Sequence, residues 1–429
     1  MKPGFWLLIL ILLMACACGP SRQLRNQIQQ VENDFQDHVG FVLYDPHRGE
    51  TLFDYQGDRY FIPASNTKIL TLFASLQLLG DSIPSLRYVV RGDSLIFWGT
   101  GDPGFLYNEV VRSDRTLNFL RTQTSKLYFS SANFASDYFG PGWSWDDYRY
   151  TYQVERTPFP IYGNRFNVRR TGRSFETTPA IFKSEVKHLL TPKDDHDLIR
   201  GLDSNALTYI PGLKDSTSDF DIPFRYSDSL LVRLLSDTLK REVNLLPITM
   251  PTDARIFHDI PSDSLYKVMM QESDNFIAEQ LLMMCGGTLT DTLSVELAIR
   301  EVKKQFLHDM PNPPVWMDGS GLSRMNLLTP RSVVFLWDKV SGMIPQERLL
   351  AILAVGGVNG TLRNYFKSDK PYIFGKTGSL RNNHNLSGFL VTRSGRTLLF
   401  SWMNNNFTTG STSVRKRMEI VLQSIYEKY

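Results

Sequence analysis

The two ends of the chain carry elements of the same kind, and this feature constrains the fold more than any other. Near the amino end, a polar segment (21–38) has apolar residues at helical spacing, and FVLYD (41–45) and TLFDY (51–55) are predicted strands around a turn. Near the carboxyl end, three strand-like runs between 371 and 405 precede a predicted helix from about 413 to 429. A single antiparallel sheet, built from both ends and covered by the terminal helices, is the most economical arrangement.

Between these ends the chain divides by composition. Residues 86–223 are rich in strand and turn signals, whereas helical periodicity returns from about residue 227. We therefore predict an α+β fold with a β-rich domain inserted at 86–223. Its parent domain, formed by 16–85 and 224–429, would hold the antiparallel sheet flanked by helices and an all-helical region.

Composition excludes several function classes. The 429 residues are 42% hydrophobic, which suits two or three globular domains, and the formal net charge of +3 comes without any basic block. Nucleic-acid binding is therefore not expected. The seven histidines are scattered and form no metal-binding pattern, so we expect neither a metal site nor a cofactor. Apart from Cys16 and Cys18 next to the leader, the sequence has only Cys285, and we predict that it is a buried apolar residue.

The first fifteen residues have the features of a secretory signal, a basic residue followed by an apolar run at 5–14. The run ends in LMAC (13–16), which resembles a bacterial lipobox, in which the cysteine is lipidated and becomes the first residue of the mature chain. We therefore expect export to the periplasmic side of the cell envelope and a lipid anchor to a membrane at Cys16. A plain signal peptide cleaved near residue 17 is the alternative.

The first candidate for chemistry is PASNTKIL, in which Lys68 lies one helical turn after Ser65. An amine can take the proton of a serine hydroxyl only if its pKa falls from about 10.4 towards neutrality, and the apolar context of Lys68 would favour that. The spacing alone does not show whether Ser65 is a nucleophile, because three other pairs share it: Ser184/Lys187, Ser264/Lys267 and Ser413/Lys416. Ser65 as a nucleophile with Lys68 as its base is one hypothesis, and an ordinary helix start is the other.

Ser273-Asp274-Asn275 falls between two predicted helical segments. These residue types are also the usual helix caps, so capping is a plain alternative. As functional residues, Ser273 could relay a proton to a leaving amine, while Asn275 could hold both the lysine and a substrate amide.

A third motif, FGKTGS (374–379), lies in a predicted strand whose glycines let a substrate backbone approach closely. Lys376 and Thr377 would hold a terminal carboxylate, and the backbone amides of Ser65 and Ser379 could form an oxyanion hole. A lysine in an ordinary hairpin is the alternative. Each motif is weak alone, but their order along one exported chain is a strong signal.

With these three motifs the sequence resembles the penicillin-recognising serine enzymes, which carry S-x-x-K, S-D-N and K-T-G. Within that group it is similar to the low-molecular-mass class C penicillin-binding proteins, which are D-alanyl-D-alanine carboxypeptidases and endopeptidases. We expect Trp143 and Trp145 to be core or interdomain aromatics and 318–321 to be a tight turn. The further family-like phrases are GTGDPGF (99–105), FGPGWSWDD (139–147), DGSGLSR (318–324) and GGVNGTLR (356–363).

The resemblance implies a β-lactamase/transpeptidase-like fold and an acyl-enzyme reaction on peptidoglycan stem peptides. Ser65 would attack the carbonyl of the penultimate D-alanine, the terminal D-alanine would leave, and water would hydrolyse the ester. A β-lactam would enter the same path and stall on Ser65. The residues that the resemblance assigns to catalysis and substrate binding are Ser65, Lys68, Ser273, Asn275, Lys376, Thr377 and Ser379.

Two other functions fit the same fold. One is a serine β-lactamase, although no motif identifies the glutamate that class A enzymes use to activate the deacylating water. The other is a catalytically silent cell-wall-binding lipoprotein. The run RNNHN (381–385) is more polar than the family pattern, which puts substrate contacts there in question.

Overall fold

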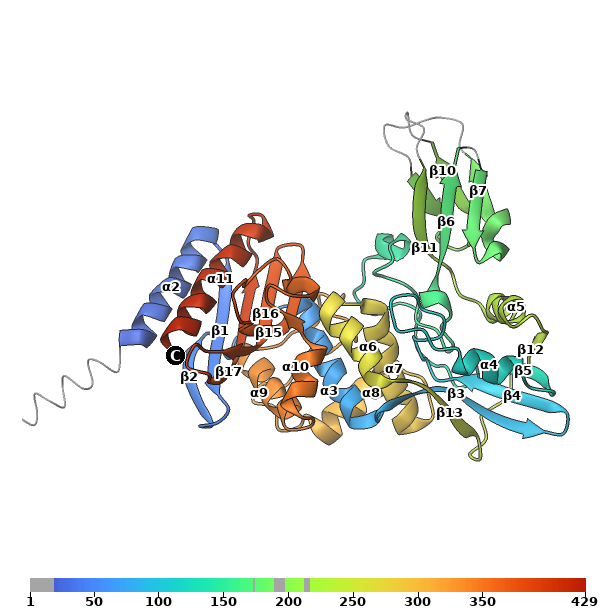
Figure 1. Cartoon of the computed structure of the whole chain (residues 1–429), viewed down its shortest axis with the longest axis horizontal. Coiled ribbons are helices and arrows are strands. Elements are labelled where there is room, and N and C mark those ends of the chain that lie inside the picture. Colours follow the sequence, from blue (N-terminus) through green and yellow to red (C-terminus); the bar gives the residue numbers. More distant parts are fainter. Residues whose placement is uncertain (1–18, 173, 189–196, 212–216) are drawn as a thin grey trace, which may run out of the picture.

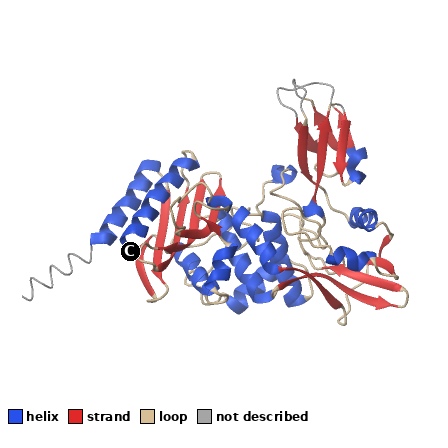
Figure 2. Ribbon diagram, in the orientation of Figure 1, coloured by secondary structure: helices blue, strands red, loops and turns tan. Residues whose placement is uncertain are grey.

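The computed structural model describes residues 19–172, 174–188, 197–211 and 217–429. The signal peptide at 1–15 and the lipidation site Cys16 lie outside these residues and stay predictions. Within the described part, none of the helices combines the length and the apolar character that a membrane span needs. The molecule is elongated, with the main sheet at one end, helices in the middle and a β-rich unit at the other end (Figures 1 and 2).

The main sheet is antiparallel throughout and joins both ends of the chain, as predicted. Its strand order is β14-β15-β16-β17-β1-β2, so a strand from the amino end pairs directly with the last strand. Phe41 lies opposite Trp402 in that pairing, and their rings are 5.2 Å apart. The strands are β1 (His38–Asp45), β2 (Glu50–Tyr55), β14 (Ala354–Val355), β15 (Ile373–Leu380), β16 (Asn383–Val391) and β17 (Thr397–Asn405).

Helices cover both faces of this sheet, which is why β16 and β17 are buried along nearly their whole length. The terminal helices α2 (Gly19–Phe35) and α11 (Ser411–Lys428) lie side by side on one face, with Leu24, Ile28 and Val31 in the shared core. On the other face, Trp337 of α9 donates a hydrogen bond to Ser387 of β16 at 3.0 Å. The predicted antiparallel sheet flanked by helices is confirmed.

The middle of the molecule is a helical layer with its own apolar core. Its central helix, α7, is buried on almost every side, and Cys285 within it is completely buried, as expected. Burial raises the pKa of the Cys285 thiol to about 12, so this residue is an apolar packing group. The helices are α3 (Lys68–Leu78), α6 (Ser262–Lys267), α7 (Asn275–Thr290), α8 (Val295–Phe306), α9 (Pro330–Ser341) and α10 (Gln346–Ile352).

The inserted unit is β-rich, as predicted, and contains a five-stranded sheet and two three-stranded sheets. Its helices are α4 (Arg115–Arg121) and α5 (Asp228–Leu239). The strands of the large sheet, in spatial order, are β12 (Val243–Leu245), β5 (Lys126–Ser130), β4 (Ser94–Gly99), β3 (Ser82–Arg91) and β13 (Arg255–Pro261). The small sheets are formed by β6 (Arg165–Thr171), β7 (Ser174–Thr178) and β11 (Ser218–Pro223), and by β8 (Val186–His188), β9 (Asp197–Arg200) and β10 (Leu207–Ile210).

Packing extends this unit beyond the predicted limits of 86–223. Helix α5 buries its apolar face in the core of the inserted unit, and β13 pairs with β3. These elements follow residue 223 in sequence but share their core with the insertion. We therefore propose that the inserted unit runs from about Ser82 to Pro261. The remaining short elements are η1 (Ala64–Thr67), η2 (Trp145–Arg149), η3 (Tyr162–Asn164), η4 (Ala180–Glu185), the π-helix η5 (Val268–Glu272) and η6 (Gly360–Leu362).

Candidate active site

Ser65 and Lys68 lie at the junction between η1 and α3, where a tight helical turn leads into a longer helix. The Lys68 Nζ is 3.0 Å from the Ser65 Oγ, so hydroxyl and amine are in hydrogen-bond contact. Ser65 is partly exposed, whereas Lys68 is completely buried. The structure therefore places an accessible hydroxyl directly against a desolvated amine.

Two glycines allow the chain to pack closely around this junction. A Cβ on Gly378 of β15 would lie 2.4 Å from the Pro63 carbonyl oxygen and 2.9 Å from the Asn66 nitrogen. A Cβ on Gly321, whose φ is +85°, would lie 1.9 Å from the Ala64 carbonyl oxygen. Because neither approach leaves room for a side chain, only glycine fits where β15 and the 318–321 turn pass the backbone around Ser65 at these two points.

The Lys68 amine is held by three oxygen atoms. Besides Ser65 Oγ, it donates to the Asn275 Oδ1 at 2.6 Å and to the Ser320 carbonyl oxygen at 2.7 Å. Burial lowers the pKa of Lys68 to about 8, although nearby carboxylates oppose part of this shift. At pH 7 a pKa near 8 leaves about one amine in ten neutral and able to accept a proton.

The second motif lies where the π-helix η5 ends and α7 begins. Ser273 has a left-handed backbone conformation, with φ of +66°, which turns the chain between the two helices. Asp274 caps α7 by accepting a hydrogen bond from the Ile277 amide at 2.8 Å, and it also accepts one from the Tyr107 hydroxyl at 2.6 Å. Capping therefore explains Asp274, while Asn275, the first residue of α7, contacts Lys68.

The third motif, on β15, meets the second through a lysine. The buried Lys376 Nζ donates to the Ser273 Oγ at 2.8 Å and to the Thr377 carbonyl oxygen at 2.8 Å. Burial, together with the nearby charge of Lys68, holds the pKa of Lys376 well below its ordinary value. The three motifs are thus brought together from positions more than 300 residues apart along the chain.

A cavity of about 340 Å³ opens over these groups. Ser65, Ser273, Thr377 and Ser379 line it, so four of the predicted site residues face one space. The Ser379 Oγ lies 2.8 Å from the Nδ1 of His384, one of the unexpectedly polar residues at 381–385. The remaining lining residues are Thr361, Leu362, Tyr365, Phe366, Leu386, Arg415 and Met418.

The polar run at 381–385 has a structural explanation. Asn385 is completely buried, and its Nδ2 donates to the Ile62 carbonyl oxygen at 2.9 Å, while its Oδ1 accepts from the Asn404 amide at 3.1 Å. The run therefore ties β16 and β17 to the segment that leads into η1. Among the described residues, no three His, Cys, Asp or Glu side chains are grouped so that they could hold a metal ion.

Sequence reasoning treated the 318–321 turn as purely structural and missed its contact with Lys68. Its shape is fixed by Asp318, whose carboxylate accepts from the Gly321 and Ser323 amides at 2.8 and 2.7 Å and from the Trp143 indole at 2.9 Å. Burial raises the pKa of Asp318 to about 6. The turn thereby presents the Ser320 carbonyl to Lys68, and the phrase DGSGLSR was the one signal that pointed to it.

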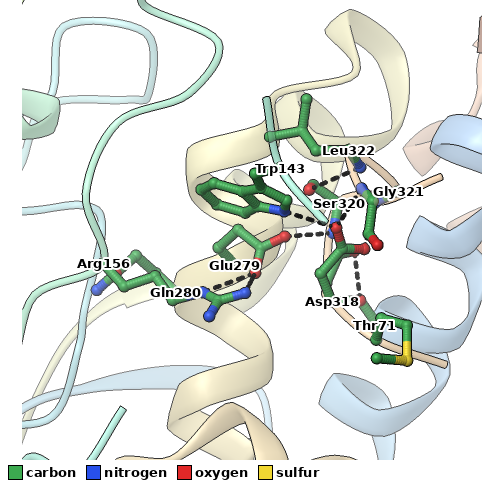
Figure 3. A network of polar contacts seen from close by, with 12 residues as sticks. Thr71, Trp143, Arg156, Glu279, Gln280, Asp318, Ser320, Gly321 and Leu322 are labelled. Carbon is green, nitrogen blue, oxygen red and sulfur yellow. Dashed lines mark hydrogen bonds and ion pairs between the residues drawn. The ribbon is translucent and has the colours of Figure 1, made fainter. Parts of the chain in front are cut away.

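A buried ion pair supports the same turn. Glu279 of α7 accepts from the Ser320 amide at 2.7 Å and pairs with Arg156 of the inserted unit at 2.6 Å, and both charged side chains are 3% exposed. The Arg156 guanidinium also lies 5.0 Å from the Trp143 ring centroid. Figure 3 shows Glu279 and Trp143 directed toward the turn. Trp143 is therefore an interdomain aromatic, as expected, but Trp145 is 76% exposed and that expectation was wrong.

Comparison with known proteins agrees with this geometry. The D-Ala-D-Ala carboxypeptidase 3 (S13) family matches residues 21–197 and 228–426. The chain belongs to this family. It is 24% identical over 433 residues to the D-alanyl-D-alanine carboxypeptidase DacB of Haemophilus influenzae, a match that covers 90% of this chain and 89% of the relative.

Two crystal structures of penicillin-binding protein 4 (dacB) from Haemophilus influenzae have the same fold as this S13 family member. One superposes with a TM-score of 0.78 at 20% identity, and the other, a complex with a β-lactam, with a TM-score of 0.73 at 18% identity. Each match covers 93% of this chain and 99% of the solved chain. The inserted unit is therefore part of the fold that these proteins share.

Replacing Arg156 with methionine tests the support of the turn in this S13 family member. The substitution leaves Glu279 charged and unpaired in a buried position, so we expect a loss of about 3–5 kcal/mol in the free energy of unfolding, measured by urea denaturation. Adding Glu279→Gln should recover much of the loss, because the unpaired carboxylate at position 279 is then gone. Arg169→Met, which breaks an exposed pair with Asp219, is the matched control and should cost about 1 kcal/mol or less. Equal losses for the two arginine variants would contradict the role of the buried pair.

Proposed function

We propose that the protein is a serine D-alanyl-D-alanine carboxypeptidase that acts on peptidoglycan stem peptides through an acyl-enzyme on Ser65. We include cleavage of cross-links, as a D,D-endopeptidase, in the same proposal. The observation that carries it is the 3.0 Å contact between the Ser65 Oγ and the buried, pKa-lowered Lys68 amine at the floor of an open cavity. Family membership supports the choice of substrate.

In the acylation step, the neutral Lys68 amine takes the proton as the Ser65 Oγ bonds to the carbonyl carbon of the penultimate D-alanine. The negative charge that develops on the carbonyl oxygen would be held by the backbone amides of Ser65 and Ser379. The contact of Gly378 with the Ser65 nitrogen supports this pairing, since an added Cβ would lie only 3.1 Å away.

The bond to the terminal residue then breaks, and its nitrogen needs a proton. Ser273 is suited to deliver this proton to the leaving nitrogen, because its hydroxyl is hydrogen-bonded to Lys376 at 2.8 Å and the residue lines the cavity. Asn275 holds Lys68 in place and would contact the substrate amide. Water finally cleaves the ester, which releases the shortened peptide and regenerates the Ser65 hydroxyl.

Lys376 and Thr377 would bind the carboxylate of the leaving residue. A β-lactam would acylate the same serine, and the β-lactam complex of penicillin-binding protein 4 supports this part of the proposal. None of the described residues that line the cavity is acidic, so no carboxylate is in place there to activate a deacylating water. We therefore propose that β-lactams act as inhibitors of this protein rather than as rapidly hydrolysed substrates.

We further propose that the protein is exported, anchored to a membrane through a lipid on Cys16, and acts on the periplasmic side of the cell envelope. The signal-like leader and the lipobox-like LMAC sequence support this location. The proposed substrate, peptidoglycan, lies on that side of the membrane.

Labelling with a fluorescent penicillin tests the nucleophile. Ser65→Ala should lower the rate of label incorporation by about 10³-fold or more, because no other hydroxyl contacts Lys68 in the described structure. Ser264→Ala is a matched control with the same spacing to a lysine, and it should label like the wild type, since Lys267 is exposed. A wild type that takes no label, or an alanine variant at position 65 that labels equally, would refute the assignment. Steady turnover of nitrocefin would instead indicate a β-lactamase.

The pH dependence of acylation tests Lys68. The folded-state pKa of this amine is lowered to about 8, and only its neutral form accepts a proton. The second-order rate of penicillin acylation should therefore rise about tenfold per pH unit below 8 and level off above it. A profile that is flat from pH 6 to pH 9, measured by stopped-flow or quenched labelling, would show that Lys68 is not the base.

Mass spectrometry of purified cell-wall fragments, before and after incubation with the protein, tests the substrate. Loss of one D-alanine from pentapeptide stems is expected for the carboxypeptidase, and splitting of cross-linked dimers for the endopeptidase. The Ser65→Ala protein is the control. Penicillin labelling without change in either fragment would indicate a protein that binds the cell wall but does not cleave it.

A further inference from the structure

We propose that Arg415 is a specificity-determining residue of this site, whose guanidinium binds the carboxylate on the leaving side of the substrate together with Thr377 and Ser379. The inference rests on the proposed function and extends it, because it names a substrate contact that none of the three motifs contains.

Arg415 reaches the cavity from α11, the helix that packs on the face of the main sheet away from the helical layer. It lines the same cavity as Ser65 and Ser273. Its Nη2 lies 3.4 Å from the Ser379 Oγ, and its guanidinium lies over the Tyr365 ring, 5.6 Å from the centroid. The residue is therefore oriented by an aromatic face and directed toward β15.

No carboxylate neutralises this guanidinium within the part of the chain that the structure describes. The Arg415 Nε is buried and has no hydrogen-bond partner. On the same helix, Arg417 pairs with Asp34 at 2.6 Å, and the Glu419 carboxylate accepts a hydrogen bond from the Phe366 amide. The nearest acidic side chain of α11 is thus engaged elsewhere, and Arg415 keeps an unpaired charge at the wall of a substrate cavity.

The other basic groups near the cavity, including Lys376, which would share this carboxylate, do not supply the same permanent charge. Lys376 already donates to Ser273 and to the Thr377 carbonyl oxygen, and burial together with Lys68 lowers its pKa. Burial also lowers the pKa of His384 to about 3, so its ring is neutral at physiological pH. An arginine stays charged at any pH the protein meets. Arg415 is accordingly the permanent cation on this side of the cavity.

A carboxylate suits this arrangement better than other groups do. The planar guanidinium presents paired N–H donors that match the two carboxylate oxygens. The Ser379 hydroxyl lies next to it, and Thr377 lines the same cavity. The chemical class that the site would favour is a peptide whose leaving residue has a free α-carboxylate. A peptide that ends in a carboxamide offers the guanidinium no charge and should be discriminated against here.

Steady-state kinetics on two peptides that end in D-alanyl-D-alanine, one as the free acid and one as the carboxamide, test this role. Arg415→Gln should raise KM for the free acid about 10- to 100-fold and change kcat by no more than about threefold. The change in kcat/KM for the carboxamide should be no more than about threefold. Arg415→Lys keeps the charge without the planar donor pair, and its KM for the free acid should lie between those of the glutamine variant and the wild type.

Lys416→Gln is the matched control, because it removes the same charge from the next, exposed position of α11. It should leave both peptides unaffected. Equal losses on the two peptides, a loss confined to kcat, or no loss at all in the Arg415 variants would overturn the inference. If Arg415→Gln does not fold, the comparison of the free-acid and carboxamide peptides with Arg415→Lys tests the inference in its place. A wild type that cleaves neither peptide would refute the proposed function itself, which separates the two failures.

Discussion

Burial of the Lys68 amine is the constraint on which the rest of the site depends. A lysine taken fully out of water loses its hydration, and this loss favours the neutral form that a base requires. Three oxygen atoms compensate for part of the lost hydration by accepting hydrogen bonds from the amine. They are the Ser65 Oγ, the Asn275 Oδ1 and the Ser320 carbonyl oxygen. Carboxylates farther away, Asp318 first among them, oppose the shift. The balance leaves a pKa of about 8, close enough to neutrality for proton transfer in both directions.

The inserted unit contributes to the site, because it supports two of the three oxygen ligands of Lys68. Asn275 donates to the Tyr152 carbonyl oxygen at 3.0 Å, and Arg156 pairs with the glutamate that holds the Ser320 amide. The segment around 152–156 therefore runs along α7 and supports two of the three ligands of Lys68. The insertion is thus coupled to the chemistry through one exposed contact and one buried ion pair, and the loss of the buried pair is costly because water does not replace it.

Residue types and their periodicity predicted the closure of the sheet by both ends, whereas the meeting of the three motifs in one site was implied by their order and by the resemblance to the penicillin-recognising serine enzymes. The sequence did not predict the Ser320 carbonyl as a ligand, since a backbone oxygen leaves no mark on residue identity. The extent of the inserted unit was missed for another reason: β13 and β3 pair across more than 160 residues, a distance at which composition is uninformative. Arg415 was invisible because α11 shows only the ordinary pattern of a helix with one solvated face.

The repeated Ser-x-x-Lys spacing shows what distinguishes a base from a surface lysine. Lys267 and Lys416 also lie three residues after a serine, on α6 and α11, but both side chains are exposed to water. The same spacing at Lys68 falls where β15, α7 and the 318–321 turn close around the amine, and glycine at two of these contacts makes the approach possible. Because desolvation rather than spacing lowers the pKa, the chemistry at Ser65 is a property of the tertiary packing. The four-residue motif supplies the Ser65 hydroxyl and the Lys68 amine, and the elements that bury the amine make it able to act as a base.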